Sequence, residues 1–361
     1  MKPATVLGLS RRLVLSGGLA LASCHRLAQA EQPSPRVPPL RQLARFPLGV
    51  EIIASVLDDP AAVSLLLANF SQITPGLEMK MERILQDDGS LTFGGADAIA
   101  DFTRANGLRL HGHNLIWYIY RPPSFTRLKD DPAAFAKAYR DYILAVAGRY
   151  RGRVGGWDVV NEPVNEDGDG YRPCLWSEMF GLDYVARAFD HAREADPDAI
   201  LFLNEYNLES RPRKLVSYLR LVETLLKQGA PLGGIGTQLH MNWDQDPAGV
   251  ETMMRELAAF GLPVHVSELD VSIHASALSL VGLDERLRRQ AALIARSAEA
   301  FERLPAHQRY AFSIWGLRDS DSWLRNAAAG GDPSDQPVLF DERGQPKLDA
   351  AALARALEQP S

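Results

Sequence analysis

Two glutamates stand near the ends of apolar runs that lie far apart in the chain. Glu162 closes WDVVNE, and Glu268 lies in VSELDV. A pair of carboxylic acids can cleave a glycosidic bond when one gives a proton to the leaving oxygen and the other, ionised, attacks the anomeric carbon. The two acids then need different surroundings to hold these protonation states at one pH. The pair predicts such chemistry on a saccharide if folding brings both residues together.

Other polar and aromatic residues stand at or just beyond the ends of apolar runs. Those that could bind or support a sugar are Lys80, His113, Trp117, Asn161, Gln238, His240, Asp270, Trp315 and Trp323. Asn161 could hydrogen-bond a sugar 2-hydroxyl group, and His240 could hold Glu268 ionised and oriented. Tryptophans offer flat faces for pyranose rings. Each residue alone could be a cap, an ion-pair member or a core residue, but their repetition favours one shared site.

Alternating short apolar runs and amphipathic segments indicate how these residues are positioned. The predicted strands are 46–53, 70–74, 108–117, 154–160, 199–204, 234–240, 263–269 and 310–317,. Helical spacing occurs in 132–150, 175–195, 212–228, 247–260 and 284–303,. Eight such units predict a single (β/α)8 TIM barrel of the α/β class, whose sites lie at the carboxyl ends of the strands. The alternative is a doubly wound open sheet, although no Gly-rich phosphate loop follows a strand.

Composition and charge exclude several classes of function. The 361 residues carry a net charge of −6 with 46% hydrophobic and 23% charged residues, which is ordinary for a globular protein,. Without a basic run, neither nucleic acid nor an anionic membrane surface is an expected partner. His111 and His113 could suggest a metal pair, but no third ligand has a convincing spacing, and the acidic loop 166–170 lacks the full calcium-loop pattern,. No metal or cofactor is therefore expected.

The first thirty residues have the layout of an export signal. Ser10-Arg11-Arg12 precedes the apolar stretch 13–22, which is typical of a twin-arginine signal and too short for a membrane span,. Cleavage could follow Ala30, or Cys24 could be the lipid-carrying residue of a lipoprotein box. We expect a signal over 1–30, a linker over 31–42 and the barrel over 43–361. The mature protein would be periplasmic, anchored to the envelope or secreted, and monomeric.

Several motifs resemble the signatures of glycoside hydrolase family 10, which are mainly endo-β-1,4-xylanases. They are HGHNLIW (111–117), WDVVNEP (157–163), FLNEYN (202–207), GIGTQLHMN (234–242), VSELDV (266–271) and IWGLRDSDSW (314–323). The resemblance covers roughly 46–357. It implies a retaining (β/α)8 enzyme with Glu162 as acid/base and Glu268 as nucleophile. Of the nine residues proposed above, all except Asp270 match sugar-binding or supporting positions of the family. Retention predicts carboxyl groups ~5–5.5 Å apart.

The chain departs from this family pattern on one side of the expected site. Gly76-Leu77 stands where family members often have a polar pair, Glu-Asn or Glu-Tyr, that hydrogen-bonds the sugar one unit beyond the cleavage point. Tyr118 replaces a usual His, and Tyr120 replaces a usual Gln. The expected activity is internal cleavage of β-1,4 bonds in a xylan-like polysaccharide. A bacterial exopolysaccharide, a substituted xylo-oligosaccharide or a β-glucan are alternative substrates, and a non-catalytic carbohydrate-binding barrel is the alternative function.

Overall fold

Parallel strands close into a barrel in the computed structural model, which describes residues 35–275 and 279–358. The strands are β1 (Leu48–Ile52), β2 (Gln72–Pro75), β3 (Arg109–Trp117), β4 (Val154–Asn161), β5 (Ile200–Glu205), β6 (Gly234–Thr237), β7 (His240–Asn242), β8 (Val264–Ser272) and β9 (Arg309–Ile314). Neighbours pair in chain order from β1 to β6, and the pairings β6–β8 and β1–β9 close the ring. The (β/α)8 prediction is confirmed.

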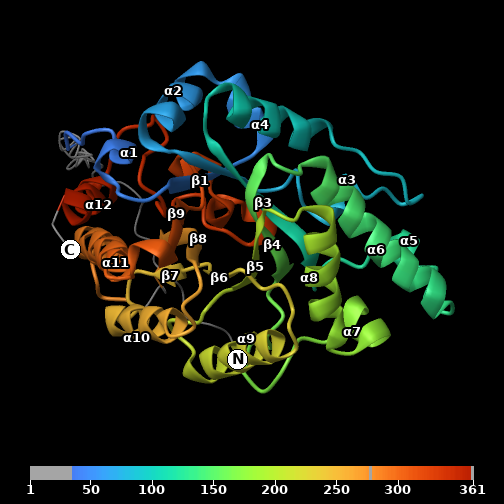
Figure 1. The fold of residues 1–361 in the computed structure, drawn as a ribbon. Helices are drawn as coiled ribbons and strands as arrows, with labels where there is room; N and C mark the ends of the chain where they lie inside the picture. The colour runs from blue at the N-terminus through green and yellow to red at the C-terminus, as the bar shows by residue number, and fades with distance from the viewer. Residues whose placement is uncertain (1–34, 276–278, 359–361) are drawn as a thin grey trace, which may run out of the picture. The chain divides into compact units, whose positions relative to one another are not determined.

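Helices surround the strands (Figure 1). The long ones are α2 (Pro60–Asn69), α4 (Gly94–Ala105), α6 (Pro132–Arg149), α8 (Asp183–Ala195), α9 (Pro212–Lys227), α10 (Pro247–Ala258), α11 (Leu283–Glu302) and α12 (Leu348–Glu358). Four begin with proline, whose fixed φ suits the first helical position,. The N-caps of α2, α6 and α10 are Asp59, Asp131 and Asp246, whose side chains accept hydrogen bonds from backbone N–H groups of the first turn,.

Two predicted elements are interrupted. The helix expected over 175–195 is wrong as one piece, because Gly181 adopts a φ of 60° between α7 (Leu175–Phe180) and α8. The strand expected over 234–240 is divided into β6 and β7, because Leu239 adopts a φ of 59°. Both breaks depend on left-handed backbone, which hydrophobic spacing does not reveal.

Close packing between the outer face of the barrel and the end of α6 requires a glycine on β3. A Cβ atom on Gly112 would lie 2.2 Å from the ring of Trp157, which is fully buried on β4. The indole therefore fills the space that a side chain at position 112 would take. This explains why the first residue of WDVVNEP is a core residue.

The N-terminal predictions fall mostly outside the described residues. Arg11, Arg12, Cys24 and Ala30 all lie there. The predicted linker 31–42 overlaps helix α1 (Leu40–Leu43), and Leu40 is buried and donates its amide to Asn69. Among the helices of residues 35–275 and 279–358, none has the length and apolarity needed to cross a bilayer.

Candidate active site

A cleft of about 1310 Å³ opens at the carboxyl ends of the barrel strands. All eleven residues predicted for the site line it: Lys80, His113, Trp117, Asn161, Glu162, Gln238, His240, Glu268, Asp270, Trp315 and Trp323. They come from β3, β4, β7 and β8 and from the segments that follow β2, β4, β6 and β9. The convergence expected from a barrel is therefore present.

Glu162 directly follows β4 and is held by three side-chain donors. Its Oε1 accepts hydrogen bonds from Asn161 Nδ2 (3.0 Å) and Gln238 Nε2 (2.9 Å), and its Oε2 accepts one from Trp117 Nε1 (2.9 Å). The backbone of Glu162 has a φ of 57°, which is uncommon for a residue with a side chain and occurs disproportionately at functional sites,. The backbone amide of Glu162 donates to the Asn204 carbonyl (2.8 Å), which holds this conformation.

Glu268 lies on β8 and has different surroundings. Its Oε1 accepts from Asn204 Nδ2 (2.8 Å), and its Oε2 lies 3.3 Å from His240 Nε2. Burial opposes the charged form, but His113, His240 and Lys80 together lower the pKa of Glu268 below its usual value. The carboxylate is therefore ionised at neutral pH, as a nucleophile must be.

Two side-chain amides, which we call the amide bridge, connect the two acids. Asn204 Nδ2 donates both to Glu268 Oε1 (2.8 Å) and to Asn161 Oδ1 (2.9 Å), and Asn161 Nδ2 donates to Glu162 Oε1 (3.0 Å). Ser267 Oγ donates to Asn204 Oδ1 (2.8 Å) and fixes the orientation of that amide. Both glutamates consequently belong to one hydrogen-bonded unit on one side of the cleft, while their carboxyl separation stays a prediction.

His240 is itself held by a carboxylate. Its Nδ1 lies 2.9 Å from Asp270 Oδ1, and Trp323 Nε1 donates to Asp270 Oδ2 (2.8 Å). Burial acts against a charged imidazole, but Asp270 and Glu268 raise the pKa of His240 to about 10. A protonated ring donates from both nitrogens, so His240 can bond to Asp270 and Glu268 at once.

Aromatic faces and a cation form the walls near the two acids. Lys80 Nζ lies 4.9 Å from the ring centroid of Trp117 and 5.9 Å from that of Trp315. Trp323 is half exposed at 49%. Flat apolar surfaces beside a few aimed polar groups suit a sugar, which has apolar ring faces and polar edges.

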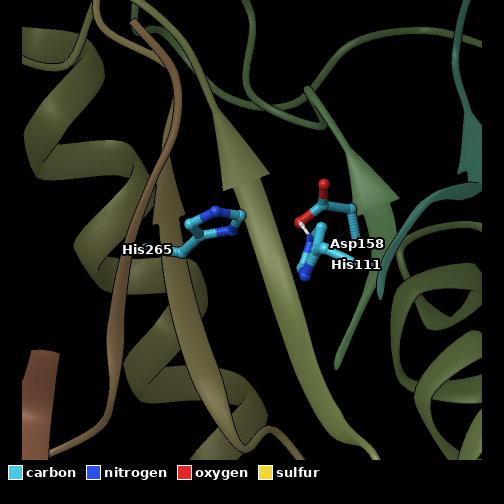
Figure 2. Close-up of side chains that lie close together, drawn as sticks. All are labelled: His111, Asp158 and His265. Atoms are coloured by element: carbon cyan, nitrogen blue, oxygen red, sulfur yellow. Dashed lines mark ion pairs between the residues drawn. The ribbon is translucent and has the colours of Figure 1, made fainter. Parts of the chain in front are cut away.

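A buried polar cluster behind the cleft offers metal-ligand atoms. His111, Asp158 and His265 place one ligand atom each within 4.8 Å of one another, and Figure 2 shows the ion pair between the first two with His265 opposite. The sequence suggested His111 with His113 and missed His265, because the third residue comes from a distant strand.

Ion-pair and hydrogen-bond contacts within the protein hold this cluster together. The two oxygens of Asp158 lie 3.1 Å from His111 Nε2 and 2.8 Å from His113 Nδ1, and His265 Nε2 lies 2.9 Å from Ser313 Oγ. Burial opposes ionisation, yet the two histidines keep the pKa of Asp158 below its usual value. A metal ion would have to displace these contacts. The role that the geometry supports is to orient His113 in the cleft.

The other side of the cleft contains a residue that the sequence reasoning missed. Glu51, on β1, lines the cleft together with Gly76, Leu77 and Tyr118. The only signal was one acidic residue within the apolar run LGVEII. The Tyr118 ring lies 4.4 Å from the guanidinium carbon of Arg172.

Comparisons with known proteins agree with this geometry. The family model described as glycosyl hydrolase family 10 matches residues 41–356. An endo-1,4-beta-xylanase A of Caldicellulosiruptor sp. (strain Rt8B.4) is 33% identical over 319 residues, which is 84% of this chain and 45% of the relative. An endo-1,4-beta-xylanase A of Thermoanaerobacterium saccharolyticum is 31% identical over 317 residues, again 84% of this chain but 26% of the relative.

A solved structure of a GH10 protein from Paenibacillus barcinonensis is also similar. It superimposes with a TM-score of 0.82 at 30% identity, over 90% of this chain and 99% of that one. The chain spans less than half the length of the two xylanases above. The match over nearly the whole barrel, with paired glutamates in the cleft, shows that the chain belongs to glycosyl hydrolase family 10.

Proposed function

We propose that this chain is a retaining, endo-acting glycoside hydrolase that cleaves internal β-1,4-xylosidic bonds in a xylan-like polysaccharide. The observation that carries the proposal is the amide bridge, which ties two buried glutamates of one large cleft into a single unit. The names of the two xylanase relatives support the choice of bond.

The two glutamates take different roles in a double displacement. Glu268 attacks the anomeric carbon and forms a glycosyl-enzyme ester while Glu162 protonates the departing oxygen. Glu162 then removes a proton from a water molecule, which attacks the same carbon and releases Glu268. The lowered pKa of Glu268, produced against burial by His113 and His240, supports its assignment as the nucleophile.

The remaining cleft residues bind sugar or support the acids. Asn161 lies between the acids through the amide bridge, where it can also reach the 2-hydroxyl group of the sugar under attack,. Lys80 and His113 offer polar contacts, and Trp315 and Trp323 offer ring faces. Asp270 and His240 support the nucleophile. No cofactor takes part in this scheme.

A related polysaccharide is the second candidate substrate. Gly76, Leu77 and Tyr118 form an unusual wall that could fit an exopolysaccharide, a substituted xylo-oligosaccharide or a β-glucan. A non-catalytic binding barrel is less well supported, because such a protein has no need of two hydrogen-bonded glutamates.

Product analysis tests the proposal. The wild-type protein is incubated with xylan, mixed-linkage glucan and bacterial exopolysaccharide, with Glu268→Ala as the inactive control, and products are sized over time. Early accumulation of short xylo-oligomers with retained anomeric configuration is the expected result. Monomer alone would contradict internal cleavage, and activity confined to another polymer would transfer the proposal to that substrate.

Export is part of the same proposal. Residues 1–30 act as a twin-arginine-like signal, followed by a linker to residue 42 and the barrel, and the mature chain acts as a monomer in the periplasm, on the envelope or outside the cell. Mass spectrometry of the mature N-terminus distinguishes lipid on Cys24 from cleavage after Ala30. An unprocessed N-terminus in exporting cells would contradict the signal.

A further inference from the structure

The Glu51 carboxyl group occupies the place of a side chain missing from the neighbouring strand. Glu51 lies on β1, and Gly76 follows directly after β2. A Cβ atom built on Gly76 would lie 1.7 Å from Glu51 Oε1. A side chain at position 76 and the present conformation of Glu51 are therefore mutually exclusive. The absence of a side chain at Gly76 creates the space that Glu51 fills.

This carboxyl group is buried without a protein partner. Glu51 is 7% exposed and lines the cleft. Within residues 35–275 and 279–358, no hydrogen bond or ion pair joins its two oxygens to another residue, and neither oxygen is sealed from the cleft. The hydrogen-bonding capacity of this carboxyl group is therefore directed to the cleft, where a ligand can use it.

The surroundings of Glu51 favour a group that can both donate and accept. Burial raises the pKa of Glu51 to about 8, with Lys80 opposing this rise and Glu78, Asp321 and Glu268 adding to it. A protonated carboxyl group has one O–H donor and a carbonyl acceptor. A sugar hydroxyl group also donates and accepts, so the two fit each other.

We propose that Glu51 is a specificity-determining residue whose carboxyl group hydrogen-bonds a hydroxyl group of a sugar unit bound along the ends of β1 and β2. The carboxyl group reaches this part of the cleft from β1 because Gly76 leaves the space beside it open. This inference rests on the proposed function only in taking the ligand to be a saccharide. It does not require the polymer to be xylan.

Three variants test this role, with a matched control. Glu51→Ala removes the carboxyl group, and Glu51→Gln keeps its shape with one donor and one acceptor. The pair Glu51→Ala with Gly76→Glu returns a carboxyl group to the same space from the other strand. Glu302→Gln is the control, because Glu302 is also a buried carboxyl residue with a raised pKa caused by burial, but it ends α11 and does not line the cleft.

Kinetics on oligosaccharides of increasing length give the main measurement. We expect Glu51→Ala to lower kcat/KM by roughly 5- to 100-fold, mainly through KM, for oligosaccharides long enough to reach the ends of β1 and β2, with a smaller loss for shorter ones. Glu51→Gln and the relocated carboxyl group should recover a large part of the loss. Glu302→Gln should behave as wild type. Calorimetric titration with the same oligosaccharides, in a Glu268→Ala background, should repeat this order in affinity.

The outcomes separate the two proposals. If the wild-type protein is inactive on every polymer, the proposed function is overturned. Calorimetric titration with an oligosaccharide that binds then decides whether Glu51 contributes to affinity. An active wild type with unchanged kcat/KM and affinity in Glu51→Ala would overturn the role of Glu51 alone. The role of Glu51 would also be overturned if neither Glu51→Gln nor the pair Glu51→Ala with Gly76→Glu recovered the lost kcat/KM. The same holds if the loss were equal for oligosaccharides of all lengths.

Discussion

The two sides of the cleft are built in opposite ways. On the side of β4, β5 and β8, the acids are tied together by the amide bridge, and Gln238, Trp117 and His240 hold them from outside. On the side of β1 and β2, Gly76 carries no side chain, Leu77 is apolar, and Glu51 has no bond within the described residues.

This difference shows where the cleft can change without loss of chemistry. In the first region Asn161, Asn204 and Gln238 each bond to more than one partner, so one substitution disturbs several contacts,. In the second region no side-chain hydrogen bond joins Glu51 or Leu77 to another described residue, and Glu51 and position 76 are related by space rather than by bonding. We therefore expect substitutions in the first region to affect the reaction and those in the second to affect which sugar is bound.

Removing the acids should give the largest effect. Glu268→Ala should lower kcat at least about 10⁴-fold, because it removes the attacking group, and Glu162→Ala should lower it by about 10²- to 10⁴-fold. Steady-state kinetics measure both, with thermal unfolding as the check on folding. Substantial turnover in a folded Glu268→Ala protein would mean that the network does not hold the nucleophile.

Replacing His240 should give an intermediate effect with a defined pH signature. The charged imidazole favours ionised Glu268, so His240→Gln raises the pKa of Glu268, and the acidic limb of the kcat/KM profile should move to higher pH,. At neutral pH we expect a loss of about 10- to 100-fold. Trp323→Phe, which removes the bond to Asp270 and keeps an aromatic ring in the cleft, is the milder comparison. An unmoved acidic limb in His240→Gln would contradict the coupling.

Glu51 should affect stability in a pH-dependent way. The folded protein keeps the Glu51 proton up to a pKa of about 8, whereas the unfolded chain releases it near 4.5. The folded state therefore binds more protons between these values, and the wild-type free energy of unfolding should fall as pH rises through them.

Glu51→Gln lacks this proton release and serves as the comparison. Its stability should exceed that of wild type increasingly above pH 4.5, by an amount on the order of a few kcal/mol at pH 9,. Denaturant unfolding at pH 4, 7 and 9 measures the difference. A constant difference at all three values would contradict the raised pKa.

The smallest effect is expected from Leu77. Leu77→Asn should change KM for longer oligosaccharides by about 2- to 5-fold and leave kcat unaltered, because a single exposed hydrogen bond contributes little. Chain-length kinetics measure this change, and Leu77→Met is the apolar control. A large fall in kcat for Leu77→Asn would mean that position 77 affects the reaction itself. The two sides of the cleft would then not differ in the way described above.

The barrel and the reacting side could be predicted because their signals are local and repeated. Apolar runs and helical spacing predicted the order of the strands and of most of the long helices. The polar residues at strand ends identified Glu162 and Glu268 as the candidate acids. Helices α2, α4 and α12 were not predicted, and the breaks at Gly181 and Leu239 depend on backbone angles that hydrophobic spacing does not encode.

Glu51 could not be predicted because its importance depends on another residue. One acid within an apolar strand resembles an ordinary buried exception, and Gly76 resembles a turn. Only the distance between a missing Cβ and the Glu51 carboxyl group connects them. His265 was missed for the same reason, since its contacts are made across the barrel.

Trp117 combines two tasks in one side chain. Its indole edge donates to Glu162, and its face lies beneath the Lys80 ammonium group. Any ligand that presses on or tilts this ring will also shift the donor that steadies the proton-transferring acid. Binding of a sugar against the Trp117 ring and the position of the Glu162 carboxyl group are thus linked. A saccharide that fits this ring poorly should therefore lower kcat as well as affinity.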